Sequence, residues 1–299
     1  MKIQKPTFEI WLQQQGMDGV YRQIERAGRV CYKSEDRQTA DSAQPFCQRM
    51  IDNQHYAMLE HGSLYLVFDA AEGAEAVDFY SHNRFSHCKE HDGKCYVSTN
   101  LRVLAENKRL DDAQYLTAPT EWHDRRITVH FTTQVGVTRE FNRHRVNSMA
   151  EQSTRYCNYS KNKFGGEMTV NLPTWVRDAD QEGFASAMAT GEMALGDEEI
   201  TALCAKVLSG NASDMENWLF GNIAAEKTYM NLIANGRKPQ EARVVLPLDI
   251  NTELVHTAFV SDWLHFFDLR ALDKTGAAHP DAKVLAVPLY KLFRSEGII

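Results

Sequence analysis

REFNRHRVNSMAEQSTRY, residues 139–156, is the stretch around which the chain is organised. It contains four arginines and two carboxylates: Arg139, Arg143, Arg145, Arg155, Glu140 and Glu151. The whole protein carries a net charge of −7, so this local excess of cations indicates a site for an anion. Arginine suits phosphate because its planar guanidinium donates two parallel hydrogen bonds. The alternative to an anion site is a solvent-exposed basic surface without a ligand, which is what most runs of charged residues form. The order of the residues, rather than their number, argues against that alternative.

The composition is that of a globular protein. The 299 residues are 43% hydrophobic and 24% charged, which gives ample length and apolar content for a buried core. The acidic balance argues against nucleic-acid binding, which usually requires a basic surface. No apolar run approaches the roughly 20 residues of a membrane span, and the start of the chain does not resemble a signal peptide. The six cysteines are scattered, so we expect reduced thiols in the cytoplasm rather than a disulfide framework.

One cluster contains residue types that could bind a metal. His87, Cys88, His91 and Cys95 lie within nine residues of one another. However, His87 and Cys88 are adjacent, and the spacing differs from the usual paired-ligand pattern of zinc sites. The sequence therefore favours a polar loop without metal.

Periodicity predicts a mixture of helices and strands. In the first half we expect helices from Asp18, from Ser42 and over 74–85, and strands over 64–68, 95–98 and 127–131. In the second half we expect a helix from Thr133 to Arg145, a strand over 168–172, a helix from Ser213 to Gly236 and a strand over 253–260. Two more helices should follow, one capped by Ser261 and burying Leu264, Phe267 and Leu272, and one over 281–294 that bends or breaks at Pro288.

These elements do not alternate strictly, which favours an α+β fold over a doubly wound sheet. There is no repeat or Pro/Gly-rich linker. We therefore expect one domain over residues 1–299, in which long helices surround a small, mostly antiparallel sheet.

The geometry of a helix constrains the two central arginines. Consecutive helical residues point about 100° apart, so Arg143 and Arg145 cannot hold one ligand from the same helical turn. Either the helix ends here, or the two serve different ligands, or one reaches a neighbouring subunit. After them, Glu151, Gln152, Ser153, Thr154 and Arg155 offer acceptors, hydroxyls, backbone donors and a guanidinium in a row. Such a segment can surround a nucleotide.

The order Arg143-His144-Arg145, seven residues, Ser153, then Arg155-Tyr156 resembles the signature of the flavin-dependent thymidylate synthases. Four other segments resemble that family and occur in the expected order. They are Ala27–Cys31, His55–His61, Glu241–Pro247 and Phe267–Arg270. Matches in several ordered segments are less often accidental than one motif.

The resemblance implies a role for each matching residue. Arg270 would be catalytic, lying on the uracil ring and stabilising its anion. The residues implied for dUMP are Glu140, Arg143, Glu151, Gln152, Ser153, Thr154, Arg155, Arg243 and Arg270. Those implied for FAD are Arg143, His144, Arg145, Glu151 and His265, with His55 and Glu60 in the folate and flavin vicinity. Each residue also has an alternative role when it is considered alone. Arg270 could instead stabilise the C-terminal end of a helix dipole, Arg243 could form a surface ion pair, and Ser153 could be a turn residue.

The resemblance also implies the reaction and its partners. The enzyme would methylate dUMP to dTMP, with methylenetetrahydrofolate as carbon donor and reduced FAD, recharged by NADPH, as hydride donor. No protein nucleophile is needed, so Cys157 would be a buried structural thiol. The family forms homotetramers with shared sites. No bound metal, nucleic-acid partner or membrane partner is implied.

This chain departs from the family pattern in several places. Ala57 lacks the hydroxyl expected between His55 and Glu60, and Phe259 and His265 stand where some members have Asn near the flavin. Residues 70–124 hold most of an unusual extra length. Two other hypotheses remain open: a flavin or nucleotide sensor that has lost turnover, and an RNA- or DNA-binding module using Arg143–Arg145. The flavin spectrum and dTMP formation by the purified protein would separate the three.

Overall fold

A four-stranded antiparallel sheet forms the centre of the molecule. The computed structural model describes residues 1–179 and 195–299. The sheet has the strand order β2-β6-β9-β7. Its strands are β2 (Thr7–Trp11), β6 (Arg126–Gln134), β9 (Asn251–Phe259) and β7 (Ser148–Glu151). β6 and β9 pair along their whole lengths, from Arg126 opposite Phe259 to Gln134 opposite Asn251. Strands distant in sequence are thereby held in one rigid frame.

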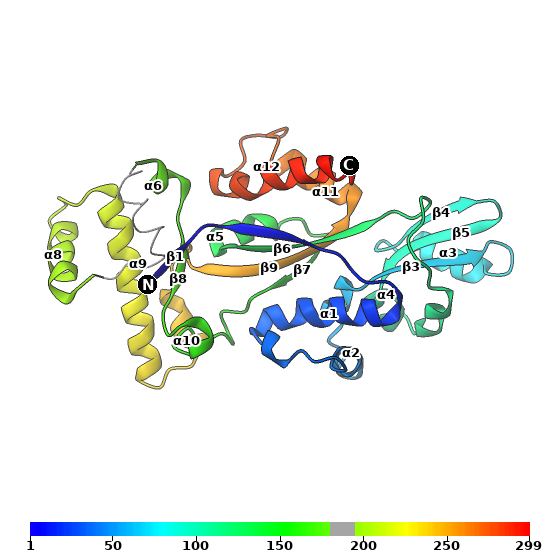
Figure 1. The fold of residues 1–299 in the computed structure, drawn as a ribbon, viewed down its shortest axis with the longest axis horizontal. Coiled ribbons are helices and arrows are strands. Elements are labelled where there is room, and N and C mark those ends of the chain that lie inside the picture. The colour runs from blue at the N-terminus through cyan, green and yellow to red at the C-terminus, as the bar shows by residue number, and fades with distance from the viewer. Residues whose placement is uncertain (180–194) are drawn as a thin grey trace.

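Helices cover both faces of this sheet (Figure 1). On one face lie α11 (Val260–Arg270) and α12 (Pro280–Ser295), and on the other lie α1 (Gly16–Tyr32) and α2 (Ala43–Asp52). The core under α11 and α12 is aromatic, and its side chains are fully buried: Phe131, Phe141, Trp263, Phe266, Phe267 and Phe293. Burying such side chains is the main favourable term in folding, at roughly 25 cal/mol for each Å² of apolar surface.

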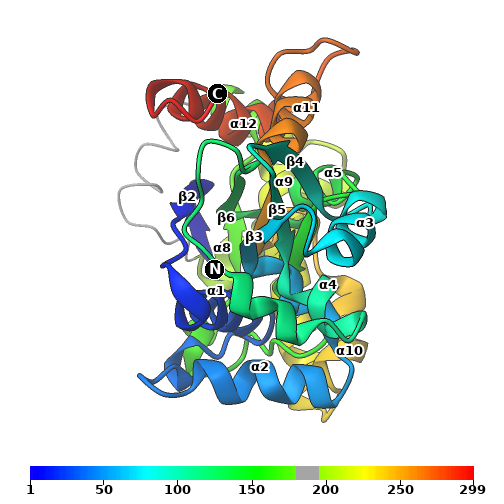
Figure 2. The same cartoon turned by 90° about the vertical axis from the view of Figure 1, so that its right-hand side faces the viewer.

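A second sheet stands at one end of the molecule and contains much of the extra length. It has the order β3-β5-β4, with strands β3 (Ser63–Asp69), β5 (Lys94–Asn100) and β4 (His87–His91). Figure 2 shows it with α3 (Ala74–His82) and α4 (Leu101–Glu106). Three short 3₁₀ turns, η1 (Glu35–Arg37), η2 (Tyr56–His61) and η3 (Leu110–Tyr115), complete this half of the chain. The prediction of a polar loop around His87–His91 is wrong, because this segment forms strand β4 and pairs with β5.

The opposite end is mainly helical. Its elements are β1 (Lys2–Gln4), α5 (Val135–Phe141), η4 (Asn162–Phe164), β8 (Thr169–Asn171), α6 (Thr174–Ala179), α8 (Asp197–Leu208), α9 (Asp214–Ala234), α10 (Pro239–Ala242) and η5 (Arg243–Val245). β1 and β8 pair in parallel. α9 begins with the predicted capping box: Ser213 Oγ accepts from the Glu216 N–H, and the Glu216 carboxylate accepts from the Ser213 N–H at 2.8 Å.

The predicted α+β class is confirmed, although the strands belong to three sheets rather than one. The strands predicted over 64–68, 95–98, 127–131, 168–172 and 253–260 are also confirmed. β7 was missed. None of the helices within 1–179 and 195–299 is both long and apolar enough to cross a membrane.

Three helix details were wrong. α1 begins at Gly16 with Gln15 as N-cap, so Asp18 lies in the first turn and is not the cap. α11 follows β9 directly, with Phe259 as N-cap in place of Ser261. Its buried face is Trp263, Phe266 and Phe267, whereas Leu264 is 45% and Leu272 39% exposed. At Pro288 the break does not occur, because α12 continues as helix through this residue, and the bend stays a prediction.

The corrected face of α11 can be tested by truncation. Phe267→Ala should lower the free energy of unfolding by about 3–5 kcal/mol, because it opens a cavity in a dense aromatic core. Leu272→Ala, at a position that is 39% exposed, should cost less than about 1 kcal/mol. Urea denaturation followed by tryptophan fluorescence would measure both. Equal losses would contradict this assignment of the buried face.

Candidate functional site

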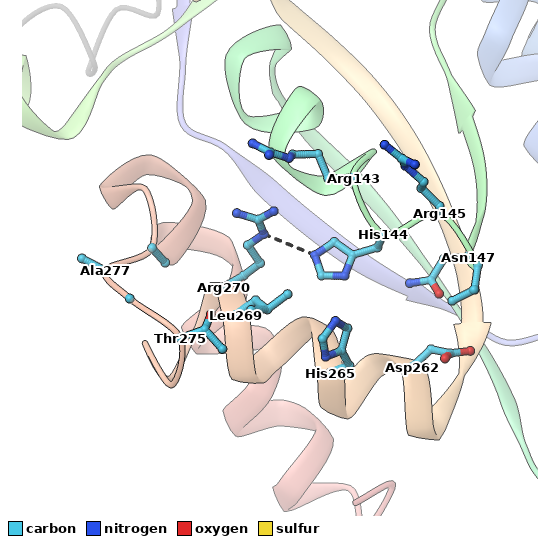
Figure 3. Close-up of a pocket in the computed structure, with 13 residues that line it drawn as sticks. Arg143, His144, Arg145, Asn147, Asp262, His265, Leu269, Arg270, Thr275 and Ala277 are labelled. Carbon is cyan, nitrogen blue, oxygen red and sulfur yellow. Dashed lines mark hydrogen bonds between the residues drawn. The ribbon is translucent and has the colours of Figure 1, made fainter.

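The central arginines lie in a turn that follows a short helix. α5 ends at Phe141, and the His144 N–H donates to the Phe141 carbonyl at 3.1 Å. The helix predicted to reach Arg145 therefore ends earlier, which is one of the three arrangements left open by the sequence. Arg143 and Arg145 are exposed, while His144 is only 6% exposed and points towards Arg270 (Figure 3).

Arg270, the last residue of α11, joins that helix to the end of α5. Its Nη1 donates to the Glu140 carboxylate at 2.8 Å, its Nη2 donates to the Glu140 carbonyl at 2.8 Å, and its Nε donates to His144 Nε2 at 3.2 Å. The carbonyl is one of the terminal acceptors that a helix leaves without an internal partner. The guanidinium is thus fixed by three acceptors, which a helix-dipole role alone does not require.

His144 must be neutral to accept this bond. Burial, together with the nearby charge of Arg270 and with His265, lowers the pKa of its imidazole to about 4. Near neutral pH the ring therefore has an unprotonated nitrogen, and Nε2 accepts from the guanidinium. A protonated ring would repel Arg270 and lose the bond.

Residues 143–147 form a turn that we call the arginine turn. Together with Arg270 it lines a pocket of about 680 Å³. Asp262, His265 and Leu269 contribute to it from α11, and residues 275–278 close one side (Figure 3). The lining contains three guanidinium groups, from Arg143, Arg145 and Arg270. Its size and its charged side chains are those of a small-molecule site for an anionic ligand. Of the residues predicted for FAD, Arg143, His144, Arg145 and His265 meet here, whereas Glu151 does not line the pocket.

Glu151 ends strand β7 and is held by α5. Its carboxylate accepts from Thr138 Oγ1 at 2.6 Å and from Asn142 Nδ2 at 2.9 Å. Glu151 is the last strand residue, and the backbone then passes into a turn. The buried Gln152 donates its N–H to the Glu253 carbonyl at 2.8 Å.

The following turn is anchored on both sides. The Ser153 N–H donates to the Cys31 carbonyl at 2.9 Å, at the end of α1. Arg155 Nε donates to Gln240 Oε1 at 3.2 Å, and Arg243 Nη1 donates to Thr154 Oγ1 at 3.3 Å. No ion pair forms at Arg243 within the described ranges, so the alternative of a surface ion pair is not the arrangement found. The fold therefore brings Arg243 to the segment 153–155, as the resemblance implies.

The predicted site residues thus form two groups joined by α5. One group lines the pocket around Arg270, and the other surrounds Ser153–Arg155. Glu140, expected with the nucleotide, is engaged by Arg270.

His55 and Glu60 belong to neither group. His55 is exposed, and the Glu60 carboxylate accepts from Arg102 Nη1 at 2.5 Å. Glu60 and Arg102 line a different pocket of about 470 Å³, beside α3 and α4. The sequence reading missed Arg102, which lies in the stretch of extra length.

The three departures from the family pattern have definite surroundings. Phe259 stacks on His87, with ring centroids 3.8 Å apart and planes 9° apart. His265 is exposed at the pocket wall, and Ala57 is exposed on η2. His87 also hydrogen-bonds Asp124 at 2.9 Å, and His91 stacks on Trp122. Across the described residues, no three His, Cys, Asp or Glu side chains are grouped to hold a metal ion.

The sequence reading also missed residues that line the pocket. They are Val146, Asn147, Asp262, Leu269 and residues 275–278. Asp262 had a local signal, since it stands three residues before His265 and so shares a helix face with it. Cys157 is fully buried, and burial raises the pKa of its thiol to about 11, in agreement with the predicted structural role.

Buried neutral histidines predict acid sensitivity. Burial lowers the pKa of His61 to about 3, as it lowers that of His144 to about 4. Between these values and the unfolded value near 6.5, the unfolded chain binds more protons, so the free energy of unfolding falls as pH falls from 6.5 towards 4. Urea denaturation at a series of pH values would measure the slope. His144→Gln should reduce that slope, and a slope identical to the wild type would contradict the neutral assignment.

Comparison with known proteins gives one family. The model of the family described as thymidylate synthase complementing protein matches residues 118–296. No curated protein is significantly similar to the chain in sequence. Two solved structures of PolB from Streptomyces cacaoi, described as a UMP/dUMP methylase bound with 5-Br dUMP and with 5-Br UMP, are 14% and 15% identical to the chain, with TM-scores of 0.41 and 0.42. They cover 99% of this chain and 93% and 92% of their own, and similarity this weak supports no argument about the site.

Proposed function

The chain belongs to the family of thymidylate synthase complementing proteins, and on this premise we propose that it converts dUMP to dTMP with FAD, NADPH and methylenetetrahydrofolate. The family match covers the arginine turn, the segment 151–155, Arg243 and Arg270. It confirms the predicted enzyme class, a methyltransferase of the thymidylate synthase type. The cofactors, the roles of single residues and the action of residues 1–299 as one catalytic domain are proposals.

The chemistry of the pocket around Arg270 suits FAD. Its volume of about 680 Å³ lies within the range of small-molecule sites. Arg143 and Arg145 have exposed guanidinium groups at its edge, which favour a diphosphate. Arg143, His144, Arg145 and His265 would hold the cofactor. FAD, when bound, supplies the hydride that completes the new methyl group, and NADPH would restore it.

The turn after β7 suits the phosphate of dUMP. Ser153 offers a hydroxyl, and Arg155 and Arg243 offer exposed guanidinium groups on one side of it. Glu151 is already fixed by Thr138 and Asn142, so it orients this turn without needing a ligand. We propose that Arg143, which lines the pocket around Arg270, contacts both ligands.

Arg270 is the proposed catalytic residue, and its environment carries the proposal. A guanidinium held by Glu140 and His144 keeps a fixed position at the pocket wall. A fixed cation beside the uracil ring stabilises the anion formed when the ring N–H loses its proton, and the ring carbon then becomes a better nucleophile. No protein thiol is needed for this activation. Glu140 and His144 act by positioning the guanidinium.

Arg270→Ala should abolish dTMP formation while FAD remains bound, because the variant removes the charge beside uracil but leaves Arg143 and Arg145. Arg270→Lys should recover only part of the activity, since lysine keeps the charge but lacks the planar fork whose separate nitrogens reach Glu140 and His144. The measurements are dTMP formation, NADPH oxidation and the flavin absorption spectrum.

Two outcomes would count against this reading. Loss of flavin in Arg270→Ala would show that Arg270 holds the cofactor instead. A wild-type protein that binds FAD but makes no dTMP from dUMP and methylenetetrahydrofolate would favour the alternative of a flavin or nucleotide sensor.

We also propose a homotetramer with shared sites. Exposed apolar side chains lie beside the exposed arginines: Val146 is 67%, Val244 79% and Leu248 52% exposed. Such side chains near a site suit contact with another subunit. Light scattering after size exclusion should give four times the 34.1 kDa chain mass, and Val244→Asp should shift the protein to smaller species. A monomer at all concentrations would contradict this proposal.

A further inference from the structure

The pocket around Arg270 is chemically asymmetric. Three guanidinium groups line it, and among its described lining residues Asp262 is the acidic one. Asp262 and His265 are three residues apart on α11, so both side chains lie on one face of that helix. Figure 3 shows them along α11, with the arginines above it. A ligand that fills this pocket therefore meets cations in one part and a carboxylate in another.

Asp262 is not neutralised by a close partner. No ion pair to it is formed within the described parts of the chain. Burial raises the pKa of its carboxyl, while the more distant charges of His87, Arg126 and His265 oppose this shift. A partly buried carboxylate of this kind is costly unless it accepts hydrogen bonds.

One of its acceptor positions already has a local use. The Phe259 N–H, at the N-cap of α11, donates to the Asp262 carboxyl. This bond satisfies one of the free donors at the helix start. A carboxylate has about four acceptor positions, so capacity remains for a ligand.

The charge pattern restricts what can bind there. A phosphate beside Asp262 would be repelled, whereas Arg143 and Arg145 attract it. The ligand group at Asp262 must therefore be an uncharged donor, such as a sugar hydroxyl or a ring N–H. Carboxylates commonly accept from the ribose hydroxyls of dinucleotides while backbone or cationic groups hold the phosphates.

We propose that Asp262 is a cofactor-binding residue that accepts a hydrogen bond from a sugar hydroxyl or ring N–H of FAD. This rests on the proposed function. It extends the predicted set of FAD residues to a side chain that neither the motif nor the family resemblance assigns. Asp262 orients the cofactor along the pocket, with its diphosphate on the arginine turn.

The experiment compares Asp262→Ala and Asp262→Asn with the wild-type protein. Flavin fluorescence would measure the Kd of FAD and FMN, and calorimetry would measure the Kd of ADP and dUMP. Asp262→Ala should weaken FAD binding by about tenfold, as expected for the loss of a hydrogen bond to a charged group, and should change dUMP binding less than twofold. Asp262→Asn keeps an acceptor for the helix N-cap and should fold normally while still losing FAD affinity.

Binding of ADP and FMN, which are fragments of FAD, shows which half of the cofactor donates the hydrogen bond to Asp262. Weaker ADP binding with unchanged FMN binding places Asp262 on the adenosine half, and the reverse result places it on the flavin half. Asp268→Ala is a matched control, because Asp268 lies on the same helix but pairs with Lys274 at 2.7 Å, outside the pocket lining.

The possible failures are distinguishable. A wild-type protein that binds no FAD would overturn the proposed function together with this inference. Unchanged binding of FAD by both Asp262 variants, with the wild type binding normally, would overturn the role of Asp262 alone. Equal weakening by Asp268→Ala would overturn it too, because the effect would then come from the stability of α11.

Discussion

The contact of Arg270 with Glu140 and His144 is the constraint on which the site depends. α5 is only seven residues long, and a helix leaves its last carbonyls without internal partners, so these need partners from elsewhere. Arg270 provides one from the end of α11 and adds an ion pair to the same residue. Two helix ends that are 130 residues apart in sequence are thereby joined. The arginine turn that begins two residues after Phe141 is fixed as a consequence.

The sheet makes this contact possible. β6 leads into α5, and β9 leads into α11 without an intervening loop. Each helix begins where its strand ends. Because β6 and β9 are antiparallel neighbours, α5 and α11 therefore begin at opposite ends of this strand pair. α11 then runs back across the sheet over Phe131 and Phe141, and its last residue reaches α5. The aromatic core under α11 therefore sets where the Arg270 guanidinium lies.

The sequence predicted the elements with strong periodicity. β6 alternates apolar and polar residues, and α9 has a capping box at its start, so both were found with nearly correct bounds. β7 was missed because Ser148–Glu151 contains no β-branched or aromatic residue, and its strand conformation comes from pairing with β9. The buried face of α11 was predicted wrongly because the helix begins at Val260, immediately after the strand. No N-cap residue in the sequence indicates this start.

For the site, the ordered motif predicted which residues lie near one another better than how they contact each other. Ser153–Arg155 and Arg243 meet as expected, and Glu140, predicted to contact the nucleotide, is also the partner of Arg270, which the sequence did not indicate. Asp262 and residues 275–278 gave no clear signal, because their position depends on the path of α11 and the loop beyond it. Residue types can indicate a ligand, but the pairing of charges within the site is a product of tertiary structure.

The burial of His144 explains how so many cations share a small volume. A charged imidazole between Arg143, Arg145 and Arg270 would add a fourth cation to the pocket, at a cost that grows in a low-dielectric setting. Burial keeps the ring neutral and makes it an acceptor for Arg270. The pocket lining thus combines three guanidinium groups with one carboxylate, that of Asp262. A helix end, a buried neutral ring and one distant arginine are therefore sufficient to hold three guanidinium groups around one pocket.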